Sequence, residues 1–142
     1  MDFKLAKVEQ TLASLEKASL DCCVELTERY SAGFTSERHV AESFFEECEG
    51  LHFTPFLPTD RWGEVDERRV FDIPVTVPWD MDGKPVYLRL TTGREERYTA
   101  FNPQFLAYVD GELRQGMDIK HTLLCLCEHA RGGQEIKVRL HA

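Results

Sequence analysis

Apolar and polar residues alternate in several short runs of the second half of the chain. The alternation is clearest in 68–77 and 134–140, and it is also found in 85–90. A period of two residues is typical of a strand that buries one face, so these runs predict three strands. The positions expected to point inward in the first and last of these strands are Phe71, Ile73, Val75, Val77, Ile136, Val138 and Leu140.

A hairpin is predicted around Asp110-Gly111. The run 104–109 is rich in β-forming residues, follows Asn102-Pro103 and ends at this dipeptide, which is the strongest short hairpin signal. A second strand is therefore expected to return through 112–115, so that 102–104 and 115–118 lie close together. The apolar run 122–127 predicts a further strand, covered on both faces, with a helix as the alternative.

The N-terminal segment has a helical period instead. Its apolar or small positions are spaced three or four residues apart, which places them along one stripe of a helix. These positions are Leu5, Val8, Leu12, Leu15, Ser19, Cys22 and Leu26. A coiled coil is the alternative, but Ser19 and Cys22 weaken the seam, so we expect a helix that packs on its own domain.

Together these elements predict a mainly β fold, an antiparallel β-sandwich preceded by an amphipathic helix. The expected organisation is a helical preface over 1–50, with a short second helix or turn within 35–50, and a sandwich over 51–142, packed as one unit. The run 51–58 contains two prolines, which predicts an edge strand or an extended connection. We expect Trp62 to anchor the domain rather than to bind sugar.

Charge and composition narrow the partners. The chain of 142 residues has a formal net charge of −8 and a pI near 5.1, which argues against nucleic acid or an anionic membrane surface. No apolar run is long enough for a membrane span. Five cysteines, an odd count, do not suggest a secreted disulfide framework, so we expect free thiols and a cytoplasmic location.

Ordered motifs in the β-rich region resemble a known family. They are Leu88-Arg89-Leu90-Thr91-Thr92-Gly93, then Asn102-Pro103-Gln104 through Asp110-Gly111, then Gln115-Gly116-Met117-Asp118-Ile119-Lys120-His121. With Asp60-Arg61-Trp62-Gly63 before them and Gly132-Gly133-Gln134-Glu135-Ile136 after them, they resemble the N-terminal domain of bacterial family 38 glycoside hydrolases, the α-mannosidases. The resemblance covers about 60–140 and implies a jelly-roll sandwich of the galactose-binding type. The chain departs from the family at Lys120, where Asn is expected, and in 69–72 and 97–99.

The resemblance implies that the parent protein is a zinc-dependent retaining α-mannosidase, whose zinc ligands and aspartate nucleophile lie in a catalytic domain outside this chain. No catalytic residue, metal site or cofactor is therefore expected here, and the chain alone should be inactive. Asp118 and His121 are the closest approach to a ligand pair, but zinc needs three or four ligands. A Cys125–His121 nucleophilic dyad lacks an identifiable orienting group.

Two functions are left open. The first is a non-catalytic domain that packs against the catalytic domain of the same polypeptide. The second is a free-standing carbohydrate-binding module, with Trp79 and Tyr98 as stacking platforms and Arg94 among its hydrogen-bonding groups. In either case, the candidate interdomain or sugar-facing surface consists of Asn102, Gln104, Gln115, Asp118 and His121. The alternative for Asn102 and Asp118 is that they only cap turns. An unpaired edge at 134–140 predicts a homodimer.

Overall fold

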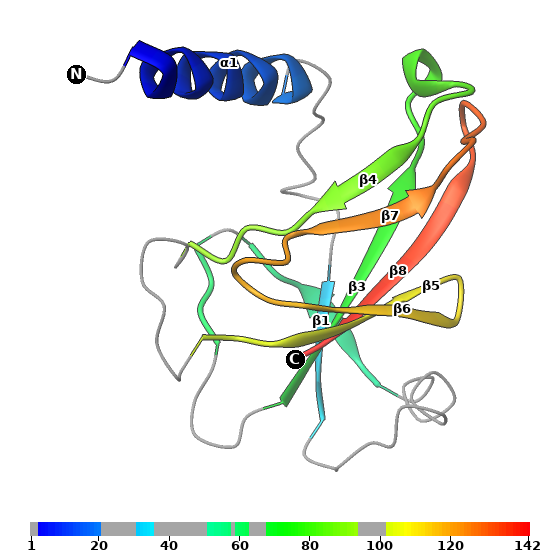
Figure 1. The fold of residues 1–142 in the computed structure, drawn as a ribbon. Helices are drawn as coiled ribbons and strands as arrows, with labels where there is room; N and C mark the ends of the chain where they lie inside the picture. The colour runs from blue at the N-terminus through cyan, green and yellow to red at the C-terminus, as the bar shows by residue number, and fades with distance from the viewer. Residues whose placement is uncertain (1–2, 21–30, 36–50, 58, 63–67, 94–101) are drawn as a thin grey trace.

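The described part of the protein is mainly β, with antiparallel sheets and one α-helix at the N-terminus (Figure 1). The computed structural model describes residues 3–20, 31–35, 51–57, 59–62, 68–93 and 102–142, with only the backbone given for 3–6, 16–20 and 31–35. The short second helix or turn predicted within 35–50 falls almost wholly outside these residues.

The helix is α1 (Phe3–Leu20), and a short 3-10 turn, η1, spans Trp79–Met81. The strands are β1 (Ser31–Thr35), β2 (Phe53–Pro55), β3 (Arg68–Thr76), β4 (Val86–Arg89), β5 (Phe105–Val109), β6 (Glu112–Met117), β7 (Leu123–Cys127) and β8 (Glu135–His141). All the runs predicted as strands in 51–142 contain a strand, and β2 is an edge strand as its prolines indicated.

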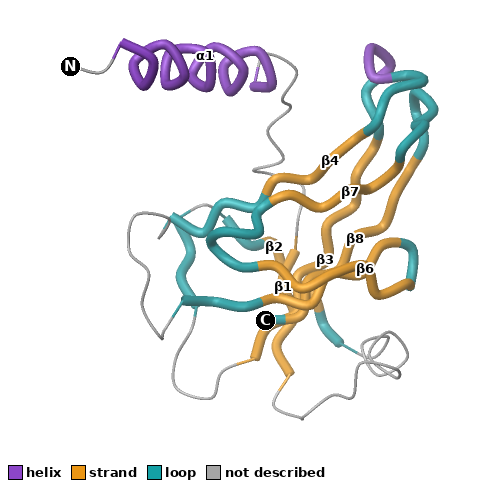
Figure 2. Tube along the Cα trace, viewed as in Figure 1, coloured by secondary structure: helices purple, strands orange, loops and turns teal. Residues whose placement is uncertain are grey.

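Six strands form one antiparallel sheet in the order β2-β1-β3-β8-β5-β6, and β4 pairs with β7 in a separate two-stranded ribbon (Figure 2). Backbone hydrogen bonds extend the ribbon at both ends, from Leu90 N–H to the Thr122 carbonyl and from Ala130 N–H to the Lys84 carbonyl. Since β4 and β7 are distant in sequence, the ribbon brings the loop 78–84 beside the loop 130–134.

The main core combines one face of the six-stranded sheet with the ribbon. Phe71, Ile73, Val75 and Val77 are buried on and just after β3, and Ile136, Val138 and Leu140 are buried on β8, which confirms the inward positions that the alternation predicted. The ribbon contributes Val86, Leu124 and Leu126 to the same cluster. β7 is covered on one face rather than both, because Leu123 is exposed while Leu124 and Leu126 are buried.

The other face of the sheet carries a smaller buried cluster. Val70 and Tyr108 pack there with Leu51 and Phe53 from the segment around β2. Arg139, which the alternation of β8 places on this face, is buried. Its guanidinium lies 5.5 Å from the Phe53 ring centroid, and its Nε donates to Asp72 Oδ1 at 2.8 Å. The β2 segment therefore covers a face that the β8 pattern alone indicated as solvent-facing.

The position of β8 corrects a second prediction. β8 pairs with β3 on one side and β5 on the other, so the run 134–140 is central in the sheet and not an unpaired edge.

β1 is a further difference from the sequence prediction. It pairs with β2 and β3 although it lies within the 1–50 segment expected to be a helical preface. The edges of the described sheet are β2 and β6.

Three side chains of the predicted helical stripe are described, and all are exposed. Val8 and Leu12 are 55% exposed and Leu15 is 62% exposed, so this part of the stripe is not covered by described residues. Packing of the helix on its own domain therefore stays a prediction. None of the described helices is long and apolar enough to cross a membrane.

Candidate functional site

The predicted hairpin brings the two halves of the candidate surface together. Asp110 and Gly111 have positive φ values of 49° and 90°, as a tight two-residue turn requires. Pairing of β5 with β6 then sets Phe105 opposite Met117, which confirms that 102–104 and 115–118 lie close together. A bulge between Ala107 and Tyr108 shifts the register along the way.

An open groove of about 500 Å³ lies at this end of the sheet. Its polar lining comes from Gln104, Asp118, Arg68 and His141, and its floor includes Phe105, Leu106, Gly116 and Met117. The groove is therefore lined by residues that carry a carboxylate, an amide, a guanidinium and an imidazole, one from each of four strand ends. Such groups bind the hydroxyl groups of a sugar or the peptide groups of another domain.

Asp118 builds the turn that follows β6. Its Oδ1 accepts hydrogen bonds from the backbone N–H groups of Lys120 at 2.7 Å and His121 at 2.8 Å. The His121 Nδ1 lies 3.1 Å from both carboxylate oxygens. These backbone hydrogen bonds, with the His121 ring as a smaller cause, lower the pKa of Asp118 from 3.8 to about 2. Asp118 thus caps a turn through local bonds, the alternative that the sequence left open, and also lines the groove.

The five predicted residues do not all converge. Gln104 and Asp118 line the groove, whereas His121 contacts Asp118 but is not among the groove residues. The Gln115 Nε2 instead donates to the Leu123 carbonyl at 2.8 Å, which ties β6 to β7. Asn102 is half-buried just before β5 and is not among the groove residues. Two of the five residues therefore line the groove, and the role of all five as an interdomain or sugar-facing surface stays a prediction.

Two groove residues, Arg68 and His141, were missed by the sequence analysis. They lie at the beginning of β3 and the end of β8, where Val70 pairs with His141 and His141 also pairs with Leu106 of β5. This convergence depends on β8 lying between β3 and β5. No local pattern in the sequence signals that order, so nothing in either run identified these residues.

The aromatic candidates separate into two kinds. Trp62 is an anchor, as predicted, since its ring centroid lies 5.4 Å from that of Phe71 and 6.0 Å from that of Phe105. Trp79 is 80% exposed and is not among the groove residues. Tyr98 and Arg94 lie outside the described residues.

No three His, Cys, Asp or Glu residues lie together as a metal-binding group in the part of the chain that the structure describes. Asp118 and His121 remain a pair, and Cys125 and Cys127 are free and half-buried. That the chain holds no metal and no catalytic residue stays a prediction.

No family model, no curated protein and no solved structure matches the chain.

Proposed function

We propose that this chain is a non-catalytic β domain of a glycoside hydrolase of the α-mannosidase type, and that its groove faces the catalytic domain of the same polypeptide. We further propose that the six-stranded sheet and the β4–β7 ribbon are the two layers of a sandwich of the galactose-binding type. The α-mannosidase activity of the parent protein is proposed only from the resemblance of the motifs to family 38 enzymes. The arrangement of those motifs in space supports the proposal.

The observation that carries the proposal is the path of the motif 102–121. This single stretch forms the segment just before β5, the hairpin with its Asp110-Gly111 turn, and the Asp118–His121 turn. It supplies most of the residues that line the groove. The motif thus maps onto one exposed rim and not onto the core alone.

The electrostatics of the rim suit a polar interdomain contact. The Asp118 carboxylate is charged at neutral pH, as an ordinary aspartate is, and Arg68 lines the same groove with the opposite sign. A partner surface that pairs with both groups fixes the orientation of the two domains more than it adds affinity.

Hydrogen–deuterium exchange tests this arrangement directly. The isolated 142-residue chain is compared with the complete polypeptide that its reading frame encodes. We expect the backbone amides of 104–106 and 116–121 to exchange more slowly in the complete polypeptide, because the catalytic domain covers them. The amides of 110–113, at the other end of the same hairpin, serve as the internal control and should be unchanged. Equal exchange at the groove in both proteins contradicts the proposal.

We also expect the chain alone to release no chromogenic leaving group from an aryl α-mannoside, with or without added zinc. The nucleophile and zinc ligands of the resembled family belong to a domain outside this sequence. Turnover that copurifies with the chain, above the rate of a buffer blank, refutes this expectation.

A free-standing carbohydrate-binding module is the second candidate, because Trp79 leaves 80% of its surface exposed. Both functions suit a cytoplasmic protein in which Cys125 and Cys127 stay reduced, whereas a zinc-containing catalytic domain is the partner in the first proposal alone. A reading frame that continues into a catalytic domain distinguishes the two candidates.

A further inference from the structure

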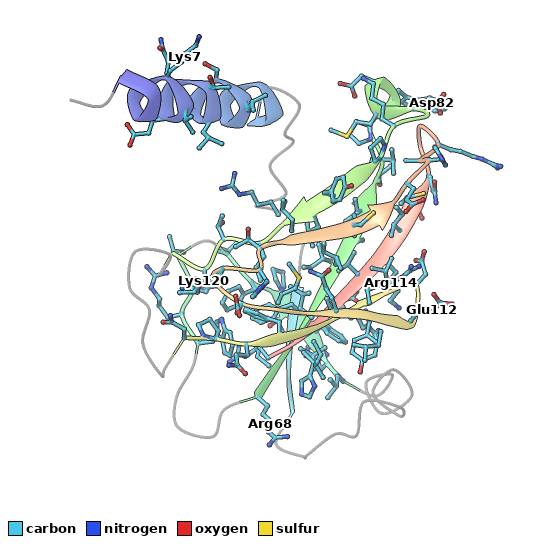
Figure 3. All side chains as sticks on the ribbon, in the orientation of Figure 1. Lys7, Arg68, Asp82, Glu112, Arg114 and Lys120 are labelled. Carbon is cyan, nitrogen blue, oxygen red and sulfur yellow. The ribbon has the colours of Figure 1, made fainter. Side chains whose placement is uncertain are left out.

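Trp79 is the most exposed large apolar residue among those described, at 80% of its surface. It opens the 3-10 turn η1 in the loop between β3 and β4. Figure 3 places this loop, marked by Asp82, at one end of the β structure and the turn containing Lys120 toward the other. The indole therefore belongs to a surface separate from the groove.

The loop that carries Trp79 is held tightly by the loop 130–134. Gly132 N–H donates to Asp82 Oδ1 at 2.8 Å, and Gly83 N–H donates to the Ala130 carbonyl at 2.8 Å. Gly133 N–H donates to the Val77 carbonyl at 2.9 Å, and Val77 precedes Trp79 in the chain whereas Asp82 and Gly83 follow it. Three cross-loop hydrogen bonds thus bracket Trp79, which lowers the entropy that a ligand must remove on binding.

One face of the indole lies against glycine backbone. A Cβ added at Gly132 would come within 2.6 Å of Trp79 Cε3, and one added at Gly133 would come within 3.0 Å of Cζ2. Any larger residue at Gly132 must displace the ring or the backbone. The six-membered ring is therefore supported from one side by two residues without side chains, while its other face is open to solvent.

Apart from Trp79, the exposed side chains of the two loops are polar. Within the two loops, which are described in full, Trp79 is the sole exposed large apolar residue, and its exposed neighbours are Asp80, Asp82, Lys84 and Arg131. A protein interface centres its aromatic anchors on an apolar patch from which charged residues are depleted. A flat apolar ring with charged groups around it instead matches a ligand that has one apolar face and many hydroxyl groups.

We propose that the indole of Trp79, resting on Gly132 and Gly133, is a stacking platform for the apolar face of a pyranose ring, with the neighbouring charged side chains as hydrogen-bonding partners for its hydroxyl groups. The choice of a mannoside as the first ligand rests on the proposed function. The platform itself rests on the geometry of the two loops.

The chain has two tryptophans, so its NMR spectrum contains two indole N–H signals, and Trp79→Phe identifies which is which. Titration with methyl α-mannoside should move the Trp79 signal and leave the Trp62 signal in place. A single stacked ring predicts weak binding, with a Kd on the order of 1–10 mM. Methyl α-glucoside and methyl β-galactoside test which pyranose is preferred, and cyclohexanol tests a ring of similar size without the array of hydroxyl groups.

Three variants sharpen the assay. Trp79→Ala should weaken binding at least about tenfold, as loss of a base stacked on an aromatic ring does. Gly132→Ala keeps the tryptophan but displaces it, and should weaken binding about fivefold or more while the fold is kept. Tyr87→Ala removes another exposed aromatic residue, 55% exposed on β4, and should leave the Kd within about twofold.

Three results overturn the platform: no shift of the Trp79 signal with any pyranoside, an equal shift with cyclohexanol, or unchanged binding in Gly132→Ala. A Trp79 signal that is already protected in the complete polypeptide identifies a protein contact instead, and also refutes it. If a glucoside or galactoside binds while the mannoside does not, the platform stands and the mannoside assignment fails. If no sugar binds but the groove amides are protected, the proposed function stands alone.

Discussion

At the residue scale, the charge of Asp118 stabilises the turn after β6. Its pKa lies at about 2 in the folded protein against an ordinary value of 3.8, so the folded state binds its proton less tightly than the unfolded chain. A lowered pKa stabilises the fold above about pH 4, and this contribution is lost as the pH falls toward 2. We expect Asp118→Ala to lower the urea midpoint at pH 7 and to flatten its decline between pH 4 and 2.

The control for this prediction is Glu135→Ala, which removes an exposed carboxylate at the beginning of β8. Urea denaturation is followed by circular dichroism at several pH values for both variants. An Asp118→Ala curve that runs parallel to the wild-type curve from pH 7 to pH 2 contradicts the assignment.

The alternation along β8 places Arg139 on the face opposite the main core, yet its side chain is buried. Its side chain is 7% exposed and pairs with Asp72, which is 25% exposed, at 2.8 Å. Removing one partner of a buried ion pair costs about 3–5 kcal/mol, and we expect about 2–3 kcal/mol for Asp72→Ala because Asp72 is partly solvated. The double variant Asp72→Leu/Arg139→Met should recover most of this loss.

An exposed pair supplies the matched comparison for Arg139. Arg114 and Glu112 lie 3.4 Å apart with side-chain exposures of 48% and 76%. Exposed pairs contribute little, so Glu112→Ala should change the free energy of unfolding by less than about 1 kcal/mol. Urea titrations at neutral pH compare the two sites. Equal effects at both sites show that the β2 segment does not bury Arg139 in solution.

At the element scale, the β5–β6 hairpin depends on backbone conformations that few residues adopt. Gly111 has a φ of 90°, which strains any residue with a Cβ, so Gly111→Ala should lower the free energy of unfolding by about 1–2 kcal/mol. Gly116→Ala is the matched control on β6, because its Cβ would lie 3.9 Å from the Phe105 carbonyl oxygen, in ordinary contact. Thermal unfolding of the two variants decides between strain and a general cost of losing glycine.

The individual strands were predictable because each depends on its own neighbours. One buried face imposes a period of two on β3, β4 and β8, and a two-residue turn with positive φ demands a dipeptide such as Asp110-Gly111. β1 was not predictable in this way, since Ser31-Ala32-Gly33-Phe34-Thr35 has one large apolar residue and no alternation to detect. Its place in the sheet comes from pairing with β2 and β3.

At the scale of the whole molecule, strand order is the information that local patterns lack. β8 pairs with β3 and β5, which are distant in sequence, and both pairings depend on tertiary packing. The groove follows from that order, so Gln104 and Asp118 were predictable through the hairpin whereas Arg68 and His141 were not. The same order removes the free edge at 134–140 on which the predicted homodimer depended, and self-association itself stays a prediction.

The last prediction concerns α1 and what covers its apolar stripe. Val8, Leu12 and Leu15 are each more than half exposed, and Figure 1 draws α1 apart from the strands. Among the residues whose side chains are described, those that build the buried clusters on both faces of the sheet lie at or beyond position 51. We therefore expect a chain that begins at residue 21 to keep the amide spectrum of 68–93 and 102–142, with its free energy of unfolding within about 1 kcal/mol of the full chain, because little apolar area is exposed by the deletion. Leu12→Asp in the full chain is the milder control.

A packed stripe predicts the reverse result, because burying three such side chains contributes several kcal/mol. A large loss of stability on deletion, together with a loss of about 1–3 kcal/mol in Leu12→Asp, supports a helix that packs on the domain in solution.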